Sequence, residues 1–170
     1  MLSTNQKDEI AVNPTLNLVD KTINEIRNIS HNLIPEELNF GLITALEDVC
    51  EKISNHGLID AYLTVDEETR DYQFKKANEL SIYRVIQEVL NNMVKHAKAT
   101  QINLNISHQQ QNIIITIKDN GSGFDTEKLK ESKGIGWKNI LARINLMGGK
   151  VSIRSAPITG TFIKINIPDA

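Results

Sequence analysis

Apolar residues near the start of the chain recur at alternating steps of three and four. They begin at Leu16 and continue through Val19, Ile23 and Ile26 to Leu33. Such heptad spacing predicts a helix whose apolar stripe is covered by another helix or by a second chain. A helix within a single globular core is the alternative. The very polar outward positions favour the first interpretation.

Pro35 interrupts this pattern, and a second helical pattern follows it. Proline removes a backbone N–H and clashes with the preceding turn, so a kink or break is expected there. The second pattern closes at the turn signal Asn55-His56-Gly57. We therefore divide the chain into residues 1–55, a polar lead-in with helical segments, and residues 56–170. The apolar positions of the second pattern are Leu38, Leu42, Ala45, Leu46, Val49 and Ile53.

Strands and helices alternate over residues 56–170. Strands are predicted over 58–66, 102–106, 113–117, 151–153 and 161–167, and helices over 77–98 and 137–147. The gap 107–111 has the length of a hairpin loop. Short connections between successive strands favour a mixed, mainly antiparallel sheet with helices on one face. The expected fold class is α+β, a two-layer α/β sandwich.

Composition excludes several classes of protein. The chain has 170 residues and a net charge of −2, so no overall basic field points to nucleic acid. Its one cysteine, Cys50, cannot form an internal disulfide or a cysteine-based zinc site. No apolar run approaches the ~18–20 residues of a membrane span, and no signal-peptide pattern opens the chain. We expect a cytoplasmic protein that makes no membrane contact through these residues.

Two glycine pairs flank a short polar segment in the second half. Asp119 ends a predicted strand, Gly121 and Gly123 follow it, and Gly134 and Gly136 come after ten intervening residues, just before a predicted helix. Glycine lets the backbone approach a ligand closely, and loop amides or a helix N-terminus attract anions. A carboxylate beside such loops suits a ligand that has both hydrogen-bond donors and phosphates, as a purine nucleotide does.

Helix 77–98 carries a polar stripe formed by Glu88, Asn92, Lys95 and His96. Residues three or four apart share a helix face. Oxygen ligands from Glu88 and Asn92 suit a hydrated Mg²⁺ ion, and Lys95 suits a phosphate oxygen. Taken alone, the stripe is better explained as a solvated helix face. Its combination with the ordered glycine loops favours a binding site.

Four segments resemble the conserved boxes of the histidine-kinase ATP-binding domain, the Bergerat fold. They are YRVIQEVLNNMVKHAKAT, DNGSGFD, GIGWKNILARINLMGGKVSIRSAP and GTFIKINIP, within about residues 57–168. The form of the first box and the short lid resemble the subfamily of nitrate/nitrite and membrane-fluidity sensors. The segment IRNISHNLIPEELNFGLITALEDV is similar to the second helix of that subfamily's dimerisation domain.

The resemblance implies roles for individual residues. Asn92 is expected to bind Mg²⁺ with help from Glu88, which is also the candidate catalytic residue. Lys95 and His96 would lie on the phosphate and ribose sides. Asp119 would accept from the adenine amine, supported by Thr161. The expected loop residues are Gly121, Gly123, Gly134, Ile135 and Gly136; Trp137 stands where the pattern has leucine.

The phosphoacceptor histidine is the missing part of this pattern. His31 is a poor candidate, because Asn32 replaces the acidic neighbour expected to act as a base, and because the segment resembles the second helix of the bundle rather than the first. His96 belongs to the nucleotide stripe, and His56 and His108 lie at turns or strand ends. The simplest interpretation is the C-terminal part of a longer kinase whose acceptor lies on another helix.

The resemblance thus implies an ATP-binding catalytic module of a two-component sensor histidine kinase. Its expected ligands and partners are ATP, Mg²⁺, a response regulator, and a second copy of the full-length kinase. A stand-alone Bergerat-fold serine kinase of the anti-sigma type is one alternative. A non-catalytic dimerisation or scaffold module with a vestigial nucleotide pocket is another.

Overall fold

The computed structural model of the protein describes residue 22, residues 35–126 and residues 135–169. The chain divides into two compact units, Met1–Glu36 and Glu37–Ala170. The heptad helix predicted over residues 16–33 lies outside the described residues, apart from residue 22, which is helical. The second unit contains the sheet and the predicted site.

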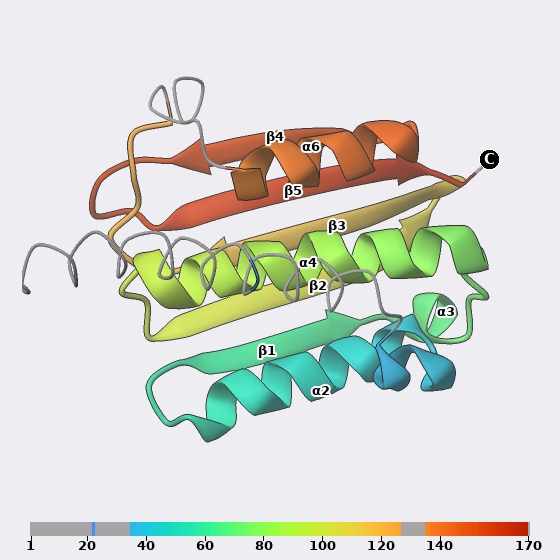
Figure 1. Ribbon diagram of the computed structural model, residues 1–170, viewed down its shortest axis with the longest axis horizontal. Coiled ribbons are helices and arrows are strands. Elements are labelled where there is room, and N and C mark those ends of the chain that lie inside the picture. Colours follow the sequence, from blue (N-terminus) through green and yellow to red (C-terminus); the bar gives the residue numbers. More distant parts are fainter. Residues whose placement is uncertain (1–21, 23–34, 127–134, 170) are drawn as a thin grey trace, which may run out of the picture. The chain divides into compact units, whose positions relative to one another are not determined.

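A five-stranded sheet forms one layer of this unit (Figure 1). Its order is β1-β2-β3-β5-β4. β1 pairs with β2 in parallel, and every other pair is antiparallel, so the predicted mixed, mainly antiparallel sheet is confirmed. The strands are β1 (Asp60–Val65), β2 (Gln101–Gln109), β3 (Asn112–Asp119), β4 (Lys150–Ser155) and β5 (Thr161–Pro168).

Three helices form the second layer, on one face of the sheet: α2 (Leu42–Asn55), α4 (Lys76–His96) and α6 (Ile135–Leu146). The short helices η1 (Glu36–Phe40) and α3 (Glu67–Arg70) precede α2 and α4 respectively. The expected two-layer α+β class is confirmed. Among the described residues, none of the helices combines the length and apolarity needed to span a bilayer.

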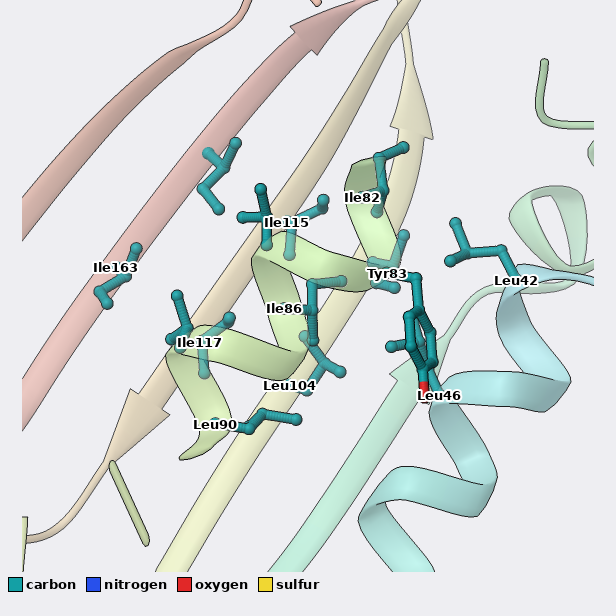
Figure 2. Close-up of a cluster of buried hydrophobic side chains, with 14 of the residues drawn as sticks. Leu42, Leu46, Ile82, Tyr83, Ile86, Leu90, Leu104, Ile115, Ile117 and Ile163 are labelled. Carbon is teal, nitrogen blue, oxygen red and sulfur yellow. The ribbon is translucent and has the colours of Figure 1, made fainter. Parts of the chain in front are cut away.

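Strand alternation explains the layering. In β3 the side chains of Ile113, Ile115 and Ile117 are fully buried, whereas Lys118 is exposed on the opposite face. Ile86 and Leu90 of α4 lie over the inner face of the sheet (Figure 2). Burying one such side chain contributes about 1.5–3 kcal/mol. This apolar seam fixes where α4, and therefore its polar stripe, lies on the sheet.

The hairpin between β2 and β3 is tighter than the gap 107–111 predicts. The strands continue to Gln109 and resume at Asn112, so the turn consists of Gln110 and Gln111. Both turn residues have positive φ, 48° and 61°. Two-residue turns with positive φ at both positions match the twist of the flanking strands, and Asn-Gly is their usual sequence. Gln-Gln gives no such signal, which is why the prediction was too long.

Helix α2 belongs to the unit that contains the sheet. Leu42, Ala45 and Leu46 are buried in the same core as α4, and α2 packs on β1. The compact unit therefore begins at Glu37, whereas the division proposed from sequence falls after residue 55. The reason is that β1 and α4 cover the apolar stripe of α2. Cys50 lies in this core, where burial raises the pKa of its thiol to about 11 and keeps it protonated.

We predict that Leu46→Ala lowers the free energy of unfolding by about 2–5 kcal/mol, because it leaves a cavity at a fully buried position between α2 and the sheet layer. Leu58→Ala is the matched control, since Leu58 is 82% exposed, and should change stability by at most about 0.5 kcal/mol. Urea unfolding of the sheet unit measures both. Equal effects of the two substitutions would contradict the packing described for α2.

Candidate functional site

A pocket of about 430 Å³ opens where several elements end together. The C-terminal end of α4, the end of β3 and the beginnings of α6 and β5 meet at the left of Figure 1. The volume lies in the range of small-molecule sites, ~300–1,000 Å³. Its lining residues are Glu88, Val89, Asn92, Met93, His96, Ala97, Asp119, Gly123, Phe124, Gly136, Trp137, Ile140, Ile153, Thr161 and Ile163.

Asp119 is the buried carboxylate of this pocket, with a relative exposure of 1%. Its Oδ1 atom accepts a hydrogen bond from the Gly121 N–H at 2.7 Å. Its Oδ2 atom is also buried, and within the described part of the chain no donor reaches it. An unpaired buried acceptor costs about 1–3 kcal/mol. Oδ2 is therefore placed to receive a donor from a bound molecule.

The loop after Asp119 is hydrogen-bonded to the end of α4 and to the residues that follow it. The Ser122 N–H donates to the Ala97 carbonyl at 2.7 Å. Asn120 Oδ1 accepts from the N–H groups of Thr100 and Gln101 at 2.9 and 3.0 Å. A Cβ at position 121 would collide with the Ala97 carbonyl, so only glycine permits this close approach of the two backbones.

The same loop is fastened on its other side to the turn between β4 and β5. The Ile158 N–H donates to the Ser122 carbonyl at 2.6 Å, and the Phe124 N–H donates to Ser155 Oγ at 2.9 Å. Gly123 has a positive φ of 62°, and a Cβ there would collide with the Ala156 carbonyl. The loop is thus held between two rigid elements, which orients the Asp119 carboxylate.

Thr161 lies opposite Asp119 in the sheet. Lys118 of β3 pairs with Phe162 of β5, so the residues one step further along these antiparallel strands come together. Thr161 is buried, and its Oγ1 atom lies 3.0 Å from Ser155 Oγ. The structure therefore brings the two residues predicted for adenine recognition to one end of the pocket.

The helix stripe is only partly in the pocket. Glu88, Asn92 and His96 line it, one turn apart along α4. Lys95 is exposed and does not line it. Spacing of three or four residues along a helix does not show which members of a stripe enter a pocket.

The start of α6 approaches Glu88 directly. A Cβ at Gly136 would collide with Glu88 Oε1, so the carboxylate rests against the first turn of the helix. Free N–H groups and the positive end of the dipole make that turn favourable for negative charge. The helix begins at Ile135, two residues before the predicted start at residue 137. Gly134 lies outside the described residues.

The donor set near Glu88 fits a magnesium ion shared with a ligand. No cluster of three or more His, Cys, Asp or Glu side chains able to hold a metal occurs among the described residues. Glu88 and Asn92 supply two hard oxygen donors in the pocket lining. Mg²⁺ usually takes one or two such groups and completes its shell with water and phosphate oxygens. The site therefore fits a hydrated ion bound together with a nucleotide.

Sequence reasoning missed the apolar walls of the pocket. Met93, Phe124 and Ile140 line it, together with Ile153 and Ile163. Such residues have the same alternation and helical spacing as core residues, so periodicity cannot separate a wall from a core. Trp137 was noted only as a departure from the expected pattern, and it also lines the pocket. These walls suit a flat apolar group such as a purine ring.

The histidines have different surroundings. His96 lines the pocket, His56 Nδ1 lies 2.6 Å from the Lys52 carbonyl, and His108 Nε2 lies 3.1 Å from Asp169 Oδ2. His31 lies outside the described residues. Of the three described histidines, His96 belongs to the pocket itself, and His56 and His108 do not line it.

Comparison with known proteins identifies the family. The family model described as "Histidine kinase-, DNA gyrase B-, and HSP90-like ATPase" matches residues 77–170. The chain belongs to this family. The match covers α4, both glycine loops and the last two strands, which are the elements that build the pocket. The resemblance seen in the sequence to the ATP-binding domain of histidine kinases is confirmed.

Two curated relatives carry the same name, signal transduction histidine-protein kinase/phosphatase DegS. The protein from Brevibacillus brevis is 33% identical over 153 residues, which are 89% of this chain and 39% of the relative. The protein from Bacillus subtilis (strain 168) is 34% identical over 103 residues, which are 59% of this chain and 27% of the relative. The chain thus spans well under half the length of these relatives.

Solved structures share the fold. The histidine kinase domain of the Erythrobacter litoralis EL346 blue-light activated kinase superposes with a TM-score of 0.66 at 20% identity, over 78% of this chain and 68% of that one. The Acinetobacter baumannii histidine kinase AdeS gives 0.62 at 15% identity, over 99% and 86%. At these identities the likeness establishes the fold alone.

We predict that Gly121→Ala destabilises the protein by more than about 2 kcal/mol and weakens nucleotide binding, because the new Cβ would push the Asp119 loop away from the backbone of Ala97. Gly57→Ala is the control. Its φ is +74° but no atom lies within 4 Å, so only backbone strain of about 1–2 kcal/mol is expected. Thermal unfolding and nucleotide titration of both variants test this. Unimpaired nucleotide binding by the Gly121 variant would contradict it.

Proposed function

We propose that this chain is the ATP-binding catalytic module of a two-component sensor histidine kinase. It would present the γ-phosphate of ATP to a histidine on a helix that these residues do not supply. The observation that carries the proposal is the buried Asp119 Oδ2 atom, which belongs to a pocket of about 430 Å³ with apolar walls and has no partner within the described part of the chain.

Adenine supplies the donor that this oxygen lacks. Its exocyclic amine would donate to Oδ2, while the Gly121 N–H continues to hold Oδ1. Thr161, opposite Asp119 in the sheet, would support the same end of the base, either directly or through water. Ile140 and Ile163 would contact the ring faces. Apolar walls with a few convergent polar groups are what a cofactor pocket requires.

The phosphates would extend from the base toward Glu88 and the start of α6. Asn92 and Glu88 would hold a hydrated Mg²⁺ ion, which neutralises phosphate charge when bound. Free N–H groups in the first turn of α6, at Gly136, would contact phosphate oxygens. His96 would lie on the ribose and phosphate side. A contact between Lys95 and a phosphate stays a prediction, because the exposed Lys95 side chain does not line the pocket.

Phosphoryl transfer in this module depends on positioning more than on covalent chemistry by the protein. A nitrogen of the acceptor imidazole would form a bond to the γ-phosphorus as the bond to the bridging oxygen breaks, and ADP would leave. The phosphoryl group would then pass to an aspartate of a response regulator. We propose that the full-length kinase acts as a homodimer, with the acceptor histidine in its helical bundle.

The length of the curated relatives supports an acceptor beyond these residues, because the matched region is only part of each. The serine-kinase and scaffold alternatives predict different chemistry. A serine kinase gives an acid-stable phosphate on its substrate, whereas phosphohistidine is labile in acid and stable in alkali. A scaffold with a vestigial pocket gives no phosphate at all.

We predict phosphorylation in trans when the histidine-bearing domain of Brevibacillus brevis DegS is mixed with this chain, ATP and Mg²⁺. The product should be acid-labile, and EDTA should abolish it. Asp119→Asn should slow the reaction about ten- to hundred-fold at subsaturating ATP, because it removes a charge-assisted hydrogen bond to the base. Asp60→Asn, at an exposed carboxylate on β1, is the control and should leave the rate unchanged.

An acid-stable product would favour the serine kinase. Nucleotide binding without any transfer to DegS, or to a histidine-bearing domain from the protein's own genome, would favour the scaffold. A rate unaffected by Asp119→Asn would contradict the proposed binding mode, even if transfer to histidine occurs.

A further inference from the structure

A second pocket, of about 340 Å³, opens on the face of the sheet opposite the helices. Lys118 of β3 and Arg154 of β4 both pair with Phe162 of β5, so the three side chains form one row across the strands. Lys118 and Arg154 are exposed, whereas their neighbours toward the helices, such as Ile117 and Ile163, are buried. The outer pocket therefore lies on the far side of the sheet from α4 and α6.

The charged side chains among the described lining residues of this outer pocket are both cationic. Lys118 and Arg154 line it, and no Asp or Glu is among its described lining residues. Neither cation forms an ion pair with any residue that the structure describes. Two strand spacings put their Cα atoms about 10 Å apart, so both side chains can reach one ligand above the Phe162 ring. Two converging cations in a concave site attract an anion.

The remaining lining groups narrow the class of anion. Thr126 lines the pocket at its loop side, and Phe162 supplies an apolar floor. Arginine binds phosphate or carboxylate in a two-pronged geometry, and lysine acts as a point charge. A phosphate monoester carries a charge of about −1.5 to −2 at neutral pH, which matches the two cations better than one carboxylate does.

We propose that the outer pocket binds a phosphate-bearing anion, with Lys118 and Arg154 on the phosphate and Phe162 under an apolar substituent. This site is separate from the nucleotide pocket and goes beyond the proposed kinase function. Inorganic phosphate and small organic phosphate esters share the required chemistry. An ester with a flat apolar group should bind more tightly, because it also covers Phe162.

The outer pocket is physically connected to the nucleotide pocket. Thr161 lines both. Ser155 lines the outer pocket, and its Oγ atom lies 3.0 Å from Thr161 Oγ1 and accepts from the Phe124 N–H. Phe124 lines the nucleotide pocket on the other side. An anion held beside Ser155 thus contacts the turn that is hydrogen-bonded to the Asp119 loop. If the anion changes the affinity for nucleotide, the nucleotide must change the affinity for the anion by the same factor.

The test is an NMR titration of the ¹⁵N-labelled chain with phenyl phosphate, inorganic phosphate and benzoate. We expect saturable shifts of backbone amides in residues 154–162, with millimolar or tighter affinity for phenyl phosphate, weaker binding of phosphate, and the weakest binding of benzoate. Lys118→Gln/Arg154→Gln should weaken phenyl phosphate binding by at least about tenfold.

The matched control is Lys150→Gln/Lys164→Gln, which removes the same charge from the same face of the sheet without touching the outer pocket. It should weaken binding far less than the Lys118/Arg154 double variant does, since neither Lys150 nor Lys164 lines the pocket. Arg154→Lys keeps the charge and should lose the two-pronged contact, so it should weaken binding even if the double variant is poorly folded.

Three results would overturn the proposal. One is the absence of saturable shifts. Another is a set of shifts confined to the start of α6, which would mean that phosphate enters the nucleotide pocket instead. The third is an equal loss of affinity in both double variants, which would mean a diffuse charge effect. Because the probes carry no adenine, each of these outcomes leaves the proposed ATP site to be judged separately.

Discussion

The structure of the site depends on how closely three backbone segments approach one another around Asp119. The loop after β3 lies against the carbonyl of Ala97 on one side and against the β4–β5 turn on the other, at distances that only glycine allows at positions 121 and 123. That packing buries the carboxylate, satisfies one of its oxygens and leaves the other facing a pocket. A larger residue at either glycine would move the group that we propose recognises adenine.

Much of this fold can be predicted from local patterns. Period-two apolar runs give β2 and β3, and the amphipathic period gives α4, because one buried face is a strong constraint on both. The exceptions have physical causes. The Gln110-Gln111 turn takes positive φ without the usual sequence signal. Helix α2 joins the sheet unit because β1 and α4 cover its apolar stripe, which no local pattern reveals.

The site was predictable in its polar residues and not in its walls. Glu88, Asn92 and Asp119 are chemically conspicuous and were found by their type and spacing. Lys95 shares their helix, but its side chain is exposed and does not line the pocket. Phe124 and Ile140 look like core residues in the sequence. Their role follows only from tertiary structure, which leaves a space between α4 and α6 instead of filling it.

The claim that Asp119 accepts a hydrogen bond from the amine of adenine is tested most directly by comparing the binding affinities of ATP and inosine triphosphate. In inosine triphosphate an oxygen acceptor replaces that amine. Equilibrium titration with Mg²⁺ should give the wild-type chain at least about a thirtyfold preference for ATP, because the analogue sets an acceptor against a buried carboxylate oxygen. Asp119→Asn should remove most of that preference. Equal affinities of the wild-type chain for the two nucleotides would contradict the account.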